Sequence, residues 1–257
     1  MQIKTKEDEG TEIDSLESML EVYNLSVHYR GNLALEGISF TVEPSQSIGI
    51  IGPNGAGKST LIKAMLGLIR VSSGSVKFCG QPLKQQLSRV AYIPQRSVID
   101  WDYPTTVKKV VMMGRTVQAG LFRRPSRQSR ELVKMALQRV DIWNLRDRPI
   151  GQLSGGQQQR VFLARAIAQQ ADILLFDEPF TGVDYKTEEI IFDIFREFKT
   201  QQKTLLIINH DLGDTLKQYD KLLLLNKYLV AWGCREEVIT PVNIQKAYGH
   251  NFGLTNP

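Results

Sequence analysis

The stretch Ser47-Ile-Gly-Ile-Ile51, followed directly by Gly52-Pro-Asn-Gly-Ala-Gly-Lys-Ser-Thr60, decides the fold of this 257-residue chain. The continuous apolar run at Ser47–Ile51 predicts a strand that is buried on both faces, as strands of parallel sheets are. The glycines of Gly52–Thr60 predict a loop, and Leu61–Leu66 has the composition of a helix. A strand, a glycine-rich loop and a helix in this order indicate an α/β fold with a mainly parallel sheet.

The loop Gly52–Thr60 has the spacing of a phosphate-binding loop (P-loop), G-x-x-x-x-G-K-[ST], at Gly52, Gly57, Lys58 and Ser59. Glycines let backbone N–H groups converge on phosphate oxygens, while the lysine reaches the β- and γ-phosphates and the serine hydroxyl can ligate Mg²⁺. A merely flexible loop is the alternative, but the strand before it and the helix after it are the context that the motif requires. The sequence therefore predicts a nucleoside triphosphate site.

A second anion cradle is predicted at Leu153-Ser-Gly-Gly-Gln-Gln-Gln-Arg160. The Ser-Gly-Gly turn runs into a helix expected over Gln157–Gln169, and the first N–H groups of a helix have no partner within it. Ser154 and Gln157 also fit a capping box, so we expect them to cap this helix as well. A functional hypothesis has to explain why one chain carries two phosphate cradles.

A predicted strand at Ile173–Asp177 ends in two acids, Asp177 and Glu178. In P-loop enzymes a carboxylate at a strand end holds Mg²⁺, and Asp177 is predicted to have that role. The adjacent Glu178 projects differently and is predicted to polarise an attacking water. A charged turn at the end of a strand is the alternative interpretation, which the presence of the P-loop disfavours.

Composition narrows the class of protein. The hydrophobic content of 42% and the charged content of 23% are ordinary for a globular chain. No apolar run approaches the roughly 18–20 residues that span a bilayer, and the start of the chain lacks the apolar core of a signal peptide. Two isolated cysteines, Cys79 and Cys234, predict a reducing compartment. We therefore expect a cytosolic protein whose membrane role, if it has one, comes through a partner.

The net charge of +5 conceals an acidic start to the chain. Residues 1–21 carry two lysines against seven acidic residues, so the remainder carries about +10. A basic body suits nucleic acid or a membrane surface, but the basic residues are scattered apart from Arg123, Arg124, Arg127 and Arg130. We interpret that cluster as a solvated surface and expect no nucleic-acid partner.

The organisation predicted for the chain is a single α/β domain with extensions. Residues 1–21 are polar and lack apolar periodicity, which predicts a disordered acidic extension. The domain at 22–250 has a core at 22–96 and 159–250, an N-terminal antiparallel β portion and an inserted helical lobe at 97–158, and residues 251–257 form a tail. Further strands are expected at Val22–Tyr29, Ile38–Val42, Ser75–Cys79, Val90–Ile93, Thr204–Asn209, Leu222–Leu225 and Leu229–Trp232, and further helices at Thr106–Gly114, Ser126–Trp143, Lys186–Gln202 and Leu212–Gln218.

The three motifs at Gly52–Thr60, Leu153–Arg160 and Leu175–Pro179 together resemble the nucleotide-binding subunit of ATP-binding cassette (ABC) transporters. The resemblance runs from Val22 to about Gly249 and implies an ATPase with ATP and Mg²⁺ as cofactors. It implies catalytic roles for Glu178, His210 and Lys58. It implies nucleotide contacts from Tyr29, Gly52, Pro53, Asn54, Gly55, Ala56, Gly57, Lys58, Ser59, Thr60, Gln95, Ser154, Gly155, Gly156, Gln157 and Asp184, and Mg²⁺ ligation by Ser59, Gln95 and Asp177.

The same resemblance gives each isolated residue a role. Tyr29 corresponds to the aromatic residue that stacks on adenine, although alone it would be interpreted as a packing residue. Gln95 corresponds to the glutamine that touches Mg²⁺ and the attacking water, and His210 to the histidine that contacts the γ-phosphate. Asp184 lies in the segment that corresponds to the family's loop for communication across the dimer. In this segment Val183 replaces the commoner leucine.

The resemblance also explains the second cradle. In the family two chains pair head to tail, so ATP on Gly52–Thr60 of one chain is capped by Ser154, Gly155 and Gly156 of the other. Symmetry then gives two equivalent sites at one isologous interface. The resemblance therefore implies a homodimer with ATP sandwiched at the interface.

A membrane partner is implied by residues 95–104, the surface that receives a helix of the integral membrane permease in this family. Trp101 and Tyr103 are plausible anchors there, and burial in their own lobe is the alternative. The runs Val98–Pro104 and Val110–Arg115 resemble ATPases of manganese, zinc and iron importers, with manganese slightly ahead of zinc. In that subgroup an extracytoplasmic solute-binding protein delivers the metal, which implies a peripheral position on the cytoplasmic side of the membrane.

Three alternatives remain open at this point. The chain could serve iron-chelate uptake, or it could be a soluble ABC-type ATPase of the cluster-assembly kind that has no role in transport. A regulatory module that binds ATP without hydrolysis is disfavoured by the presence of Glu178 and His210.

Overall fold

The apolar strand β3 (Ser47–Ile51) lies inside a six-stranded sheet with the order β10-β9-β3-β8-β7-β6, and all of its residues are buried. The computed structural model describes residues 19–29, 31–116 and 124–249. Within this sheet only β10 runs antiparallel to its neighbour, which confirms the mainly parallel α/β fold. The other strands of the sheet are β6 (Val90–Ile93), β7 (Ile173–Asp177), β8 (Thr204–Ile208), β9 (Lys221–Asn226) and β10 (Tyr228–Gly233).

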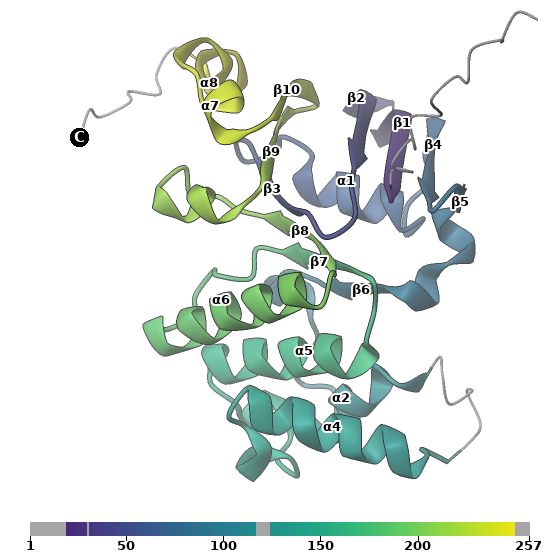
Figure 1. Cartoon of the computed structure of the whole chain (residues 1–257), viewed down its shortest axis with the longest axis vertical. Coiled ribbons are helices and arrows are strands. Elements are labelled where there is room, and N and C mark those ends of the chain that lie inside the picture. Colours follow the sequence, from purple (N-terminus) through teal and green to yellow (C-terminus); the bar gives the residue numbers. More distant parts are fainter. Residues whose placement is uncertain (1–18, 30, 117–123, 250–257) are drawn as a thin grey trace, which may run out of the picture.

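A second, antiparallel sheet lies beside the first and has the order β2-β1-β4-β5 (Figure 1). Helix α1 (Lys58–Met65) packs between the two sheets, because its buried side chains share one core cluster with residues of both. The antiparallel strands are β1 (Leu20–Tyr29), β2 (Asn32–Val42), β4 (Ser73–Phe78) and β5 (Gln81–Pro82). The predicted antiparallel N-terminal portion is therefore confirmed.

Helices cover the other face of the six-stranded sheet in two layers (Figure 1). The first layer holds α5 (Gly155–Gln169) and α6 (Tyr185–Thr200), and the second holds α2 (Val107–Met113) and α4 (Arg127–Arg139). One continuous core cluster joins both layers to the sheet. Helix α5 crosses 158–159, the predicted boundary between lobe and core, so the lobe and the core share this helix.

Alternation along the buried strands produces the two cores. In β7, Ile173 and Leu175 face α1 and the antiparallel sheet, whereas Leu174 and Phe176 face the helices. Successive side chains of a strand point to opposite faces, and apolar residues at every position make both faces suitable for burial. The apolar runs in the sequence therefore place this sheet in the middle of the molecule.

Some strands and helices begin or end at other residues than predicted, because the sequence pattern does not reveal the backbone conformation of single residues there. Strand β2 begins at Asn32 rather than Ile38, because Gly37 (φ +60°) forms an irregularity within the strand instead of ending it. Helix α4 ends at Arg139 rather than Trp143, since Asp141 adopts a left-handed conformation (φ +56°). Strand β1 begins at Leu20, inside the predicted extension.

Two short helices after the β9–β10 hairpin are absent from the prediction: α7 (Arg235–Val238) and α8 (Pro241–Tyr248). They pack at the β9 and β10 side of the sheet (Figure 1). Residues 1–18 of the predicted extension, Arg123 and the predicted tail 251–257 lie outside the described residues. In the described part of the chain, no helix combines the length and apolar character needed to cross a membrane.

Candidate functional site

Four adjacent parallel strands bring the predicted site residues to one edge of the sheet. The strands lie in the order β3-β8-β7-β6, and their carboxyl ends lead to Gly52, His210, Asp177 and Gln95 respectively. In open α/β sheets ligands bind outside the carboxyl ends of the strands. Residues that are far apart in the sequence therefore converge there because the strands are parallel and neighbouring.

The P-loop depends on glycine at two positions where backbone and core approach closely. A Cβ on Gly52 (φ +149°) would lie 2.1 Å from the carbonyl oxygen of Leu225, and one on Gly57 (φ +96°) would lie 2.6 Å from Leu35. Gly57 is the N-cap of α1, and no side chain caps the helix at this end. The first N–H groups of α1 are therefore directed to a ligand rather than to a capping side chain.

The Lys58 side chain is 6% exposed and folds back over the loop. Its Nζ donates to the carbonyl oxygens of Gly52 at 2.7 Å and of Pro53 at 3.0 Å, and an ammonium has three donors in total. Burial lowers the pKa of Lys58, while the carboxylates of Glu178 and Asp177 act in the opposite direction. The loop thus holds the cation in place with a donor left for a phosphate.

A cavity of about 320 Å³ opens beside the loop and extends to the antiparallel sheet. One end is formed by Tyr29, Leu33 and Ala34 from the β1–β2 region, and the other by Glu178 and His210. The remaining wall is the P-loop, at Asn54, Gly55, Ala56, Gly57, Lys58, Ser59 and Thr60. The cavity therefore has an aromatic and apolar end for a base and a charged end for a terminal phosphate.

Three side chains converge on Glu178. Gln95 donates from Nε2 to Oε2 at 2.6 Å, Nε2 of His210 is paired with Oε1, and Oγ1 of Thr181 lies 3.5 Å from Oε2. Glu178 also adopts a left-handed backbone conformation (φ +56°), which is unfavourable for a residue with a Cβ. Its carboxylate contacts His210 and Gln95, whereas the carboxylate of Asp177 contacts Ser59 and Tyr92.

Asp177 and Ser59 form the candidate Mg²⁺ site. Oγ of Ser59 donates to Oδ1 of Asp177 at 2.9 Å, and the Tyr92 hydroxyl donates to Oδ2 at 3.4 Å. Octahedral Mg²⁺ with ligands at about 2.1 Å places neighbouring ligand oxygens about 3 Å apart, so the observed pair fits the ion. Asp177 is 3% exposed, and burial raises the pKa of its carboxyl above the ordinary value.

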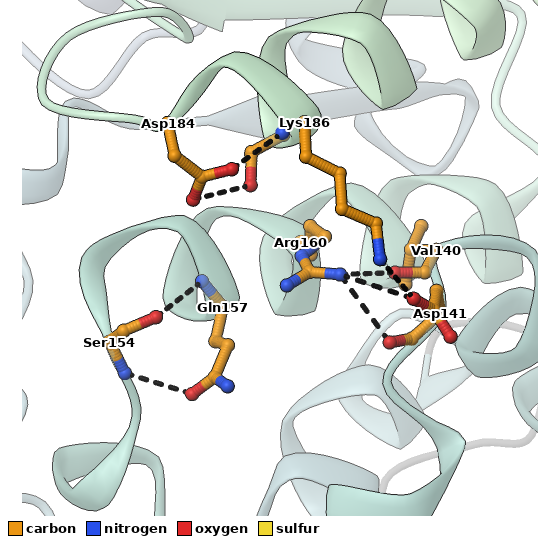
Figure 2. Close-up of polar contacts among 8 residues, drawn as sticks. Val140, Asp141, Ser154, Gln157, Arg160, Asp184 and Lys186 are labelled. Atoms are coloured by element: carbon orange, nitrogen blue, oxygen red, sulfur yellow. Dashed lines mark hydrogen bonds and ion pairs between the residues drawn. The ribbon is translucent and has the colours of Figure 1, made fainter.

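The second cradle lies on a different surface, at the start of α5 (Figure 2). The amide of Gln157 donates to Oγ of Ser154 at 3.4 Å, and Oε1 of Gln157 accepts from the amide of Ser154 at 3.0 Å, which confirms the predicted capping box. We call Ser154–Gln157 the signature turn. It is not among the residues that line the two cavities at the P-loop, so the structure does not bring the two predicted cradles together within one chain.

Asp184 lies against the signature turn of its own chain. It caps α6, accepting from the Thr187 amide at 2.9 Å and from the Thr187 hydroxyl at 3.1 Å (Figure 2). A Cβ added to Gly156 would lie 2.4 Å from Oδ2 of Asp184 and 2.7 Å from Oγ1 of Thr187. Gly156 is therefore needed for packing against α6, whatever else it contacts.

The ABC transporter family matches residues 35–181. The chain belongs to the ABC transporter family.

This cassette is similar to ATP-binding proteins of metal transport systems. It is 47% identical over 230 residues to the manganese transport system ATP-binding protein MntB of Bacillus subtilis, which covers 90% of this chain and 92% of that protein. It is 42% identical over 244 residues to the zinc transport system ATP-binding protein TroB of Treponema pallidum, covering 95% and 92% respectively. An ATP-binding cassette of an ABC transporter in its ADP conformation superposes with a TM-score of 0.73 at 26% identity, over 90% of this chain and 96% of that one.

Two of the residues expected at the permease-facing surface of the cassette differ in exposure. Tyr103 is 56% exposed and is available to a partner. Trp101 is half-buried, packs edge-on against Phe162 with ring centroids 5.6 Å apart, and donates from Nε1 to the carbonyl of Arg96. Trp101 is therefore packed in its own lobe, as the alternative interpretation predicted.

Sequence reasoning missed two residues that lie near the ATP site of the cassette. Tyr248, the last residue of α8, lines a second cavity of about 750 Å³ together with Gly52, Gln95 and Glu178. Arg96 follows Gln95 and contacts α5. The spacing of known motifs gives no signal for Tyr248, but the position of Arg96 directly after a motif residue could have drawn attention to it.

Proposed function

We propose that this cassette is the ATP-hydrolysing subunit of an importer of a transition-metal ion, with manganese ahead of zinc. The similarity to the manganese transport protein MntB and the zinc transport protein TroB supports a transition metal as the transported ion. The observation that supports ATP hydrolysis is the position of Glu178. Gln95 and His210 hold its carboxylate at the charged end of the cavity beside the P-loop.

Hydrolysis is the in-line attack of water on the γ-phosphate of ATP. Glu178 orients and polarises the water, and Gln95 and His210 fix the carboxylate and contact the water and the γ-phosphate. Lys58 stabilises charge that develops on the phosphate oxygens, and the adenine stacks on Tyr29. Ser59 and Asp177, with Gln95, would hold Mg²⁺, which neutralises charge on the β- and γ-phosphates.

The active form proposed is a head-to-tail homodimer. Ser154 of the signature turn is exposed and sits at a helix N-terminus, while the P-loop forms a cavity in its own chain, so each would complete the other across the interface. Asp184 would couple the two ATP sites of the dimer, because it contacts the signature turn of its own chain. ATP then favours the dimer, and hydrolysis loosens it.

The cassette would act as a peripheral subunit on the cytoplasmic side of the membrane. The proposed partners are an integral membrane permease, bound through residues 95–104 with Tyr103 exposed, and an extracytoplasmic solute-binding protein that delivers the metal. The proposed domain is the predicted 22–250 extended to Leu20 by β1, and α5 is common to the predicted lobe 97–158 and the predicted core.

The test is reconstitution of the cassette with the permease that co-purifies with it from membranes. We expect ATP hydrolysis to rise when the solute-binding protein is loaded with Mn²⁺ or Zn²⁺, and to remain basal with the unloaded protein. The Glu178→Gln variant should retain ATP and accumulate as a closed dimer, with turnover lower by about 10²–10⁴-fold. Wild-type turnover in that variant would show that Glu178 is not catalytic, and stimulation by a ferric chelate instead would overturn the metal assignment.

A further inference from the structure

The loop that follows Gln95 is fastened to the start of α5. Nε of Arg96 donates to Oε1 of Gln158 at 2.8 Å, and Nε2 of Gln158 donates to the carbonyl of Ile150 at 3.3 Å. Gln158 is 4% exposed, so this contact of a charged donor lies in a largely water-excluded place. Hydrogen bonds with an ionised partner are stronger than neutral ones, which makes Arg96 a firm connection between the loop and the helix.

A second connection comes from Trp101, five residues along the same loop. Its Nε1 donates to the carbonyl of Arg96 at 3.1 Å, and its ring meets Phe162 of α5 edge-on, at an interplanar angle of 79°. A Cβ on Gly151 would lie 2.7 Å from the carbonyl oxygen of Trp101. The loop therefore contacts both α5 and the residues that precede it.

The Arg96 guanidinium lies along the signature turn itself. A Cβ added to Gly155 would be 2.7 Å from one terminal nitrogen of Arg96 and 3.0 Å from its Cζ. The preceding residue, Gln95, donates to Glu178 at 2.6 Å. Neighbouring residues of one loop thus contact the proposed catalytic carboxylate and the signature turn, so a displacement of this loop would reach both.

We propose that Arg96 is a positioning residue that makes the loop 96–101 and the signature turn move as one body. This inference rests on the proposed function, in which Gln95 serves ATP held by its own chain and Ser154 caps ATP held by the partner. A displacement of the permease-facing loop then reaches both ATP sites of the dimer together, one through Gln95 and the other through Ser154. Arg96 thereby couples the state of the permease to both hydrolytic sites.

The experiment compares Arg96→Met and Gln158→Met, singly and together, in the full chain. We expect each single variant to lower kcat about tenfold, because small misplacements of reacting groups have effects of this size or larger. The KM for ATP should stay near wild type, since Arg96 does not line the P-loop cavity. The Tm should fall by a few degrees, because each substitution removes a hydrogen bond of the buried Gln158. The double variant should lose no more than the worse single variant, because both remove the same contact.

Two further variants separate positioning from folding. Gln158→Glu keeps the oxygen that accepts from Arg96, so it should retain most of the kcat that Gln158→Met loses, even if Arg96→Met folds poorly. Arg196→Met removes an exposed arginine paired with Asp193 on α6 and should leave kcat unchanged. Unchanged kcat in both methionine variants, or additive losses in the double variant, would overturn the proposal.

The proposal and the proposed function fail in different ways. In the Glu178→Gln background, light scattering should show an ATP-dependent dimer that Arg96→Met weakens. If the Glu178→Gln chain forms no dimer with ATP, the proposed function fails. If it forms the dimer equally well with and without Arg96, and kcat is also unaffected, only the positioning role fails.

Discussion

The starts of α1 and α5 are both helix N-termini with a glycine-rich approach, yet their surroundings differ. At α1 the N-cap is Gly57, no side chain caps the helix, and the buried Lys58 and a cavity surround the free amides. At α5 the N-cap is Ser154, its own capping box with Gln157 engages the first turn, and Ser154 is exposed. The comparison shows that a helix N-terminus becomes a self-sufficient anion site only when the rest of the fold encloses it.

The largest difference should appear when each cradle loses its main polar side chain. Lys58→Ala removes a charged donor, so the Kd of the isolated chain for ATP should rise about 10–100-fold. Ser154→Ala should leave that Kd within about twofold, because the serine does not line the cavity, while the kcat of the dimer falls. Titration of a fluorescent ATP analogue measures both, and an equal rise in Kd for the two variants would mean that both cradles of one isolated chain contact the same nucleotide.

Gly156→Ala, at the second cradle, should have a smaller effect than the loss of Lys58 at the first. The new methyl group would meet the carboxylate of Asp184 and the hydroxyl of Thr187, so α5 and α6 must separate. We expect kcat to fall about tenfold while ATP affinity of the isolated chain is unchanged.

The cause of that effect can be checked by relieving the collision. Asp184→Ala removes the nearer obstructing group and also the cap of α6, so the Tm loss caused by Gly156→Ala should be smaller in the Asp184→Ala background than in the wild type. An equal Tm loss in both backgrounds would contradict the collision with Asp184 and assign the loss to the backbone of the turn. Calorimetry on the three variants makes the comparison.

The smallest expected effect is a change in stability, and it concerns Asp177, the buried acid beside the first cradle. Burial raises the pKa of Asp177, so its ionisation favours the unfolded chain, and stability is lost as the pH rises from the ordinary Asp pKa of about 3.9 through the raised value. Asp177→Asn should therefore raise the Tm at pH 7, by roughly 2–4 °C for each ~1 kcal/mol gained, while Mg²⁺-dependent hydrolysis is lost.

The pH dependence separates this explanation from general repacking. The Tm advantage of Asp177→Asn should shrink as the pH is lowered toward about 4, because the unfolded chain then also begins to bind the proton that the native carboxyl retains. Thermal melts of both proteins between pH 4.5 and 8 provide the measurement. An advantage that does not change with pH would show that the ionisation of Asp177 is not its source.

Much of this fold could be predicted because the local patterns agree with the tertiary structure. The apolar run of β3 predicts a strand buried on both faces, which is observed, and β7 and β8 lie where strands are predicted. The prediction was less accurate where one residue changes the backbone, as Gly37 does within β2 and Asp141 does after α4. It missed α7 and α8, which are short and lack a long periodic pattern.

The sequence by itself determined the residue types of the site, because P-loop spacing, a strand ending in two acids and a Ser-Gly-Gly turn each have a local chemical reason. Only the tertiary structure decided which of them meet. Strand order places Gln95, Asp177 and His210 beside the P-loop, and it leaves Ser154 on another surface. The link from Arg96 to Gln158 is equally invisible in the sequence, because the two side chains are joined by packing between a loop and a helix that are distant along the chain.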